Sequence, residues 1–405
     1  MSKPSFTCVT GPLGPHRAGF EAELARMGYS PWTVSAHLYR MAALSCWLER
    51  RKVGLSELDS AAVLVFLADP GASWQAARIT SRGMAPLLTY LRARELMPVQ
   101  VRSYDGPMGW LVAEFVSHLV SERALAPQTI RGYENTAVRF LAGCGLDQTV
   151  TGECRLVTLT GRLIRDFVLA ESARLSAGSA NNVGSGLRAL MVFLYLRGYT
   201  DGSLADAVPR GVVWRDTGRS RALPAADALL LLASCDRDTA CGRRNFAILT
   251  LLWRLGLRAD EVASLRLEDL DWRAGELVLR GKGNRLDRLP LPVDVGEVLA
   301  DYCQRSRVSR GDRHVFLKTR APYDRLTSSA VTLVVTHACE VAGLPRSGAH
   351  CLRHGTATAM RAAGAPLLEV GQVLRHGRIV TTAFYAKDDL TALTTIARAW
   401  PGEQA

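Results

Sequence analysis

Between Gly256 and Tyr385 the sequence contains a set of side chains that could act together on a phosphate group. His350 and Arg353 lie three residues apart at an expected helix start, so both point to one face. The remaining members are two further cations, a histidine and a phenol. In chain order the set is Arg258, Lys282, His350, Arg353, His376 and Tyr385.

Cleavage of a phosphodiester has three requirements that this set can meet. Arginine and histidine donors stabilise the charge that develops on the non-bridging oxygens. Tyr385 could attack the phosphorus and form a covalent intermediate. Lys282, on a flexible turn, could give a proton to the leaving oxygen. The sequence lacks the carboxylate cluster of a two-metal nuclease, so we expect a reaction with neither metal nor cofactor.

The net charge is consistent with a polyanionic partner. The 405 residues include 50 basic and 38 acidic ones, which leaves +12 and a pI near 9.5. The excess is spread over the chain, with 23 basic and 18 acidic residues up to Asp216 and 27 and 20 after it. Nucleic acid is the commonest large polyanion in a cell, so both halves could contact the same nucleic acid. A basic protein without such a partner is the alternative.

Composition excludes several other classes of protein. Hydrophobic residues make up 48% and charged residues 22%, as in ordinary globular domains. No apolar stretch is long enough for a transmembrane helix, and the first residues lack the apolar core of a secretory signal, so we expect no membrane association. The nine cysteines are scattered and never form a C-x-x-C pair, which favours free thiols in a reducing cytoplasm.

The elements that must position the six residues can be predicted in outline. Arg258 should open a helix over 259–267, and Lys282 should lie on the turn of a hairpin between strands 276–280 and 288–292. Helical spacing predicts the other elements of this half at 225–235, 240–255, 294–305, 326–342, 350–363, 366–374, 379–386 and 389–398.

The first half reads as two similar groups of helices. Ser30-Pro31 is a strong helix start, with a capping serine and proline at the first helical position. Pro31-x-Thr33 recurs 96 residues later as Pro127-x-Thr129, which suggests two related four-helix units. The alternative is that helical bundles resemble one another without duplication.

Residues 217–400 resemble the catalytic domain of the tyrosine recombinases, the phage integrase family. The family signature is Arg, Lys, His-x-x-Arg, His or Trp, and Tyr, and the six residues named above match it in order. Glu261 and His354 match positions that support the reacting groups. The segment Leu-Arg-His-Gly departs from the family's Leu-Gly-His, because Arg375 replaces glycine and would be strained if the backbone there has a positive φ.

The resemblance implies a multidomain, mainly α-helical fold. One or two helical SAM-like core-binding domains would precede a mixed α+β tyrosine-recombinase catalytic domain with a small antiparallel sheet. The expected parts are an N-terminal helical domain at 15–98, a core-binding domain at 108–200, a linker at 201–223 and a catalytic domain at 224–400 that ends in a helix. The apolar face of that last helix could fold back on its own domain, but the resemblance favours docking on a neighbouring protomer.

The resemblance also implies a role for each residue. Tyr385 would attack the scissile phosphate and form a 3′-phosphotyrosyl link, which releases a 5′-hydroxyl without metal or ATP. Arg258, Arg353 and His376 would hold the phosphate oxygens. Lys282 would protonate the leaving oxygen, and His350 would assist proton transfer at the tyrosine.

The expected partner is double-stranded DNA, bound by a homo-oligomer with two protomers per site and four in the synapse. The expected location is the cytoplasm of a prokaryote, in association with the nucleoid. Three alternatives to an independent site-specific recombinase remain open: a type IB topoisomerase that relaxes supercoils, a non-catalytic DNA-binding regulator, and a recombinase that requires other recombinases of the same mobile element.

Overall fold

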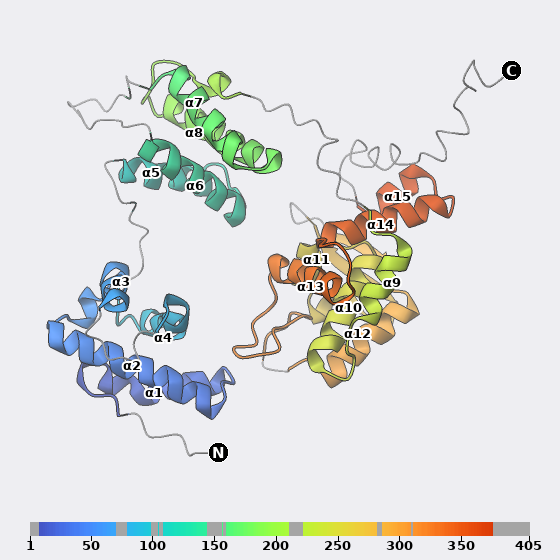
Figure 1. The fold of residues 1–405 in the computed structure, drawn as a ribbon, viewed down its shortest axis with the longest axis horizontal. Helices are drawn as coiled ribbons and strands as arrows, with labels where there is room; N and C mark the ends of the chain where they lie inside the picture. The colour runs from blue at the N-terminus through green and yellow to red at the C-terminus, as the bar shows by residue number, and fades with distance from the viewer. Residues whose placement is uncertain are drawn as a thin grey trace. The chain divides into compact units, whose positions relative to one another are not determined.

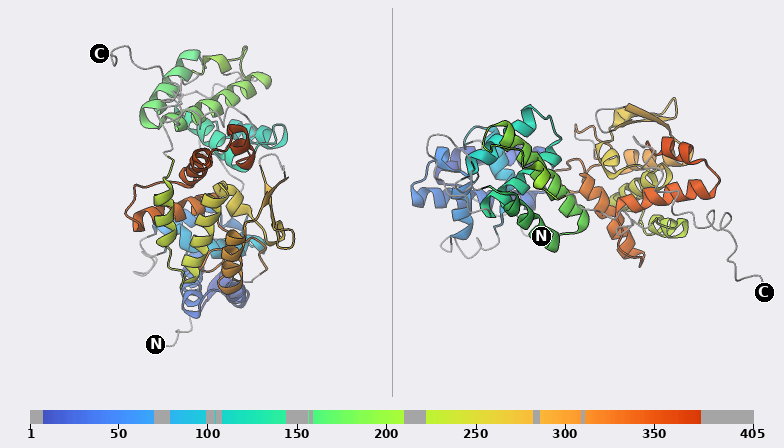
Figure 2. Two further views of the ribbon diagram at one scale, coloured as in Figure 1. Left: turned by 90° about the vertical axis from the view of Figure 1, so that its right-hand side faces the viewer. Right: turned by 90° about the horizontal axis from the view of Figure 1, so that it is seen from above.

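The fold is taken from a computed structural model and is mainly helical, with one small sheet (Figures 1 and 2). The structure describes residues 8–69, 79–98, 104, 108–143, 156, 159–209, 222–281, 286–308 and 311–375. The chain separates into two compact units. One consists of Pro98–Arg219, and the other includes both Met1–Met97 and Ser220–Ala405. The two segments of the second unit keep separate hydrophobic cores.

The N-terminal segment has four α-helices around one core. They are α1 (Arg17–Arg26), α2 (Pro31–Arg51), α3 (Ser60–Ala68) and α4 (Ser81–Ala93), preceded by the short 3-10 helix η1 (Gly11–His16). The predicted start of α2 is confirmed, because the Ser30 hydroxyl accepts a hydrogen bond from the Thr33 N–H at 3.3 Å. The core is formed by apolar side chains of all these elements, including Leu13, Phe20, Met41, Phe66 and Leu87.

The unit Pro98–Arg219 has a second four-helix core. Its helices are α5 (Gly109–Ser121), α6 (Pro127–Gly143), α7 (Gly161–Arg174) and α8 (Ala177–Leu196). α6 packs most extensively on α8, and α5 and α7 cover the pair. The buried side chains at the centre of this core include Phe115, Phe140, Ile164, Leu187 and Phe193.

The C-terminal segment surrounds α10 (Ala240–Arg254) with helices. Its neighbours are α9 (Ala225–Ala233), α12 (Val293–Arg305), α13 (Ser328–Val341) and α14 (Ala349–Ala362), while α15 (Leu367–Val373) packs on α14. α11 (Ala259–Ser264) follows α10 and leads to an antiparallel sheet with the order β1-β2-β3, made of Leu270–Asp271, Glu276–Arg280 and Leu286–Pro290.

The hairpin predicted from the sequence is confirmed, with one shift. β2 has the expected bounds, but its partner β3 begins at Leu286 and pairs Val278 with Arg288 and Leu277 with Leu289. Lys282 was expected on the connecting turn, and it lies outside the described residues, as do the helices expected at 379–386 and 389–398.

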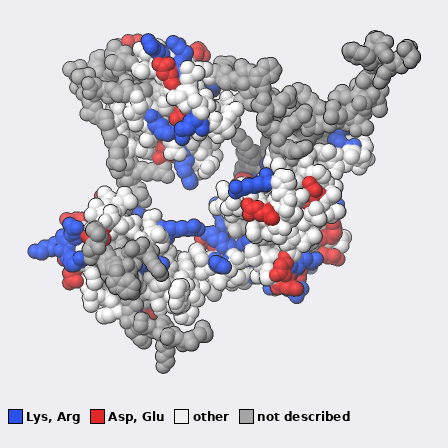
Figure 3. Space-filling view, viewed as in Figure 1, with Lys and Arg blue, Asp and Glu red and all other residues white. Residues whose placement is uncertain are grey.

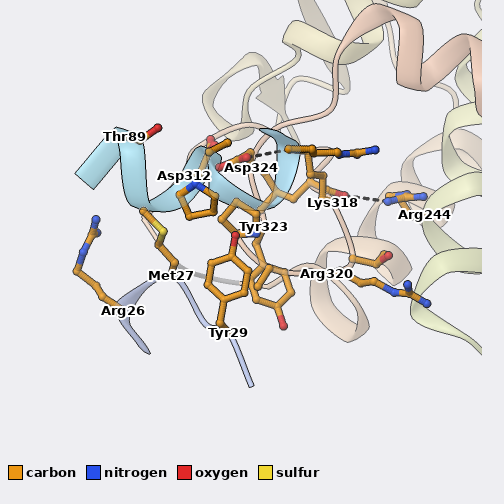
Figure 4. Close-up of a pocket in the computed structure, with 17 residues that line it drawn as sticks. Arg26, Met27, Tyr29, Thr89, Arg244, Asp312, Lys318, Arg320, Tyr323 and Asp324 are labelled. Atoms are coloured by element: carbon orange, nitrogen blue, oxygen red, sulfur yellow. Dashed lines mark hydrogen bonds and ion pairs between the residues drawn. The ribbon is translucent and has the colours of Figure 1, made fainter. Parts of the chain in front are cut away.

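The loop between α12 and α13 is fixed by polar contacts (Figure 4). Arg244 of α10 is 8% exposed and donates to the Leu317 carbonyl at 3.1 Å. The Lys318 ammonium pairs with Asp324 at 2.8 Å. The two contacts join α10 to the loop and close the loop on itself.

Charged residues are interspersed on the described parts of the face seen in Figure 3. Basic and acidic side chains alternate there, as expected for a modest excess of positive charge spread along the sequence. No helix within the described residues is long and apolar enough to cross a membrane.

Candidate active site

Arg258 is placed by the turn that joins α10 to α11. Gly256 has φ +57° there, a conformation that favours glycine, and Arg258 is the N-cap residue of α11. The Arg258 N–H donates to Glu261 Oε2 at 2.8 Å, and its Nη1 donates to Glu261 Oε1 at 2.6 Å. The arginine side chain remains 43% exposed, so a ligand can reach it.

Glu261 is the buried anion of the site. Its side chain is 5% exposed and pairs with Arg258 at 2.6 Å and with Arg375 at 2.9 Å. Burial raises the pKa of Glu261, but the charges and hydrogen bonds of Arg375 and Arg258 outweigh it, and the resulting pKa lies below the ordinary value. The carboxylate therefore stays ionised and fixes the Arg258 guanidinium.

Arg353 is buried near the start of α14 and connects it to two other parts of the chain. The residue is 1% exposed, and its Nη1 donates to the Gly256 carbonyl at 2.5 Å while its Nη2 donates to the Leu374 carbonyl. One guanidinium thus joins α14 to the turn before Arg258 and to the end of α15. A cation held this way adds positive charge beneath the site.

His350 and His354 form a pair one helical turn apart on α14. Their Nε2 atoms are 2.9 Å apart, and the ring centroids are separated by 4.4 Å in an edge-to-face arrangement. Burial of the ring and the nearby charges of His354, Arg353 and Arg258 lower the pKa of His350 to about 4, although the residue keeps an exposed edge. His350 is therefore neutral near pH 7 and can accept a proton.

The structure thus brings five of the predicted residues together. Arg258 with Glu261, and His350 with His354, are joined by direct contacts, and Arg353 connects the two groups through the carbonyls that it binds. The other three candidates, Lys282, His376 and Tyr385, lie outside the described residues. Their roles remain predictions from the sequence.

Arg375 has a role that the sequence did not indicate. Its φ of +54° shows that the position has the left-handed conformation that glycine adopts easily, as the departure from the family pattern suggested. Its side chain is 5% exposed and pairs with Glu261, and its carbonyl accepts from Arg258 Nη2 at 3.1 Å. The signal in the sequence was the arginine that replaced glycine just before His376.

Arg375→Gly should destabilise the protein less than Arg375→Ala does. Both substitutions remove one partner of the buried Glu261, but only alanine must keep a side chain at positive φ, which costs about 1 kcal/mol more. The difference can be measured by thermal unfolding of the two variants beside the unmodified chain. Equal melting temperatures would show that the backbone relaxes at this position.

Comparison with known proteins agrees with the resemblance described from the sequence. The sequence matches the Phage integrase family over residues 221–391 and the Phage integrase, N-terminal SAM-like domain over 112–198. An integrase/recombinase of Sinorhizobium fredii is 36% identical over 402 residues, which cover 97% of this chain and 96% of that protein. Tyrosine recombinase XerD of Mycobacterium tuberculosis is 29% identical over 300 residues, which cover 71% of this chain and 95% of XerD.

Two solved structures resemble the fold. A lambda integrase dimer bound to a COC′ core site has a TM-score of 0.54 at 18% identity and covers 70% of this chain and 96% of that one. The XerH site-specific recombinase bound to palindromic difH substrate also has a TM-score of 0.54 at 18% identity, with 71% and 84% covered. These likenesses confirm the expected fold class, with mainly helical domains and a small antiparallel sheet.

Proposed function

The chain belongs to the phage integrase family of tyrosine recombinases, and from this premise we propose that it cleaves and rejoins duplex DNA with Tyr385 as the nucleophile. Members of this family transfer DNA strands, so the chain is a DNA strand transferase that acts in site-specific recombination. The observation that supports the residue roles is the buried Glu261, which holds Arg258 while Arg353 ties the same turn to α14.

The proposed reaction is an exchange of esters at one phosphate. The Tyr385 oxygen forms a bond to phosphorus as the bond from phosphorus to the 5′-oxygen breaks, which leaves a 3′-phosphotyrosyl link and a free 5′-hydroxyl. Lys282 gives its proton to that oxygen, and Arg258, Arg353 and His376 stabilise the charge on the phosphate. The new ester conserves the energy of the old one, so a second 5′-hydroxyl can reverse the step without ATP.

His350 fits the role of proton acceptor for the tyrosine. A pKa of about 4 keeps its imidazole neutral, and the His354 Nε2 at 2.9 Å orients the ring. The phenol proton could pass to a neutral imidazole but not to a cationic one.

The acid side of the pH–rate profile should therefore have an apparent pKa well below 6.5. Protonation of His350 also disfavours the fold, because its folded pKa lies below the unfolded value, so stability falls as the pH drops from about 6.5 towards 4. Single-turnover cleavage of a nicked site between pH 4.5 and 8 measures the profile. His354→Gln removes one of the charges that lower this pKa and should move the acid side to higher pH. An unmoved profile would exclude His350 as the titrating group.

The substrate and assembly follow from the same premise. We propose that two protomers bind each duplex site and that four form the synapse, alone or with other recombinases of one mobile element. We also propose that the protein works in the cytoplasm of a prokaryote, in association with the nucleoid, since its named relatives are bacterial proteins. The predicted C-terminal helix, which would link protomers, falls outside the described residues.

Covalent capture on genomic DNA tests the proposal. The purified chain is incubated with a fragment library and denatured with SDS, and the DNA that remains attached is sequenced. We expect a few shared sites that are lost in Tyr385→Phe. Attachment scattered over all fragments would favour topoisomerase activity. Absence of attached DNA would contradict independent recombination and favour a regulator or dependence on a partner recombinase.

A further inference from the structure

The N-terminal segment repeats the burial pattern of the unit Pro98–Arg219. Four positions buried in α2 have buried counterparts in α6, each 96 residues later. They are Leu38, Met41, Leu44 and Ser45 in α2, and Glu134, Ala137, Phe140 and Leu141 in α6. This is the same spacing as that between Pro31 and Pro127, the first residues of the two helices. Agreement at four positions with one constant spacing is more than the general likeness of helical bundles requires.

The other helices repeat with similar spacings. Thr80 caps α4 and Ser176 caps α8, again 96 residues apart, and the buried set Leu87, Leu88, Tyr90 and Leu91 corresponds to Val183, Gly184, Gly186 and Leu187. The corresponding positions of α3 and α7 lie 101 residues apart. Asp59 and Thr160 are the N-caps, and Val63 and Ile164 are the first buried residues. Phe20 and Leu24 of α1 precede Phe115 and Leu119 of α5 by 95.

The packing also agrees. α2 packs on α1 and α4, as α6 packs on α5 and α8. The second of these two sets, within 112–198, matches the SAM-like domain of phage integrases. The first set shows the same architecture outside that matched region.

We propose that residues 8–97 are a second copy of the SAM-like domain and that they hold DNA phosphates through Arg40 and Arg82, without recognising base sequence. This inference rests on the proposed function, because it adds DNA contacts to those of a recombinase. Residues 8–97 include 10 basic and seven acidic residues, an excess of three. The unit at 108–200 has nine and seven, an excess of two. The first copy is thus better suited to attract a phosphate backbone.

Arg40 and Arg82 form no ion pair within the described residues. A Cβ placed on Gly83 would lie 3.2 Å from Arg40 Nε, so Arg40 of α2 lies beside the first turn of α4, where Arg82 is exposed. Within the described ranges, neither arginine pairs with a carboxylate. Burial and the Arg40 charge lower the pKa of His37 to about 4, so the neutral His37 Nδ1 accepts from Arg40 Nη1 at 3.3 Å and adds no opposing charge.

The corresponding face of the second copy has different chemistry. A groove of about 570 Å³ between α6 and α8 is lined by amide and hydroxyl side chains, among them Gln128, Asn135, Ser179 and Asn182. Such side chains recognise base edges. At the matching positions the first copy has Trp32, Tyr39, Gly83 and Pro86, none of which offers an amide. The loss of these amides favours contact with phosphates over recognition of bases in the first copy.

The test compares arginine and asparagine variants of the full chain. Arg82→Ala and Arg40→Ala should each weaken binding to a captured site and to an unrelated duplex by the same factor, and each should reduce the slope of log affinity against log salt by about 1. Asn182→Ala should weaken binding to the captured site alone. Arg51→Ala is the matched control, since this exposed arginine pairs with Asp69 at 3.2 Å and lies about 16 Å from Arg40 along α2.

Each possible result of these measurements either supports or contradicts the proposed phosphate contacts. Arg82 is exposed and lacks a partner within the described residues, so its variant should melt like the unmodified chain even if Arg40→Ala does not. Salt slopes unchanged in both arginine variants would overturn the inference and favour a protein partner for this segment. Weaker binding to the captured site alone would overturn the absence of base recognition. A chain that binds DNA with the expected slopes but never forms a covalent complex would contradict the proposed function and leave this inference intact.

Discussion

Tyr385→Phe is expected to abolish covalent attachment to DNA while DNA affinity stays within about twofold of the unmodified chain. The substitution removes one oxygen atom, which is the proposed nucleophile, and keeps the aromatic ring. Loss of a nucleophile typically costs a factor of roughly 10⁴–10⁶ in rate. An SDS-resistant complex on a labelled site measures the attachment, and a gel shift measures the affinity.

The matched control for this experiment is Tyr323→Phe. Tyr323 precedes Tyr385 as the nearest tyrosine in the chain, and it belongs to the loop between α12 and α13. The Tyr323→Phe variant should form the covalent complex at the rate of the unmodified chain. A covalent complex that persists in Tyr385→Phe and disappears in Tyr323→Phe would show that Tyr323, and not Tyr385, is the nucleophile.

Local signals in the sequence predicted much of the fold. The Ser30-Pro31 start of α2 and the strand Glu276–Arg280 depend on residues that are close in the chain, and both are confirmed. The second strand was predicted to begin at 288, two residues later than it does, because the sequence of Leu286 and Asp287 does not indicate a strand. Pairing with β2 decides their conformation, and that is a tertiary effect.

Only part of the site could be predicted in the same way. The contact between Arg258 and Glu261, and that between His350 and His354, follow from helical spacing of three and four residues. The pair of Glu261 with Arg375 joins residues 114 apart, and its geometry needs a positive φ at an arginine. The carbonyl contacts of Arg353 likewise depend on the backbone of two distant turns. Spacing in the sequence contains no information about such contacts.

Arg353→Ala is expected to cause the largest combined loss of activity and stability among the described site residues. Its guanidinium is 1% exposed and satisfies the carbonyls of Gly256 and Leu374. Hydrogen bonds from a charged donor are worth about 1.5–3 kcal/mol each, so we expect a loss of about 3–5 kcal/mol in the free energy of unfolding. Removal of the charge and of the bonds that place Arg258 should slow cleavage by roughly 10²–10³-fold.

Arg258→Ala separates the two effects. The Arg258 side chain is 43% exposed, and its partner Glu261 keeps the ion pair with Arg375, so the loss of stability should be only about 1 kcal/mol. Cleavage should nevertheless slow by a similar factor of roughly 10²–10³, because this exposed guanidinium can meet a phosphate. Chemical denaturation gives the stability of both variants, and single-turnover cleavage gives their rates. If Arg353→Ala cleaved normally once folded, Arg353 would be a structural residue and Arg258 would be the cation that acts on the phosphate.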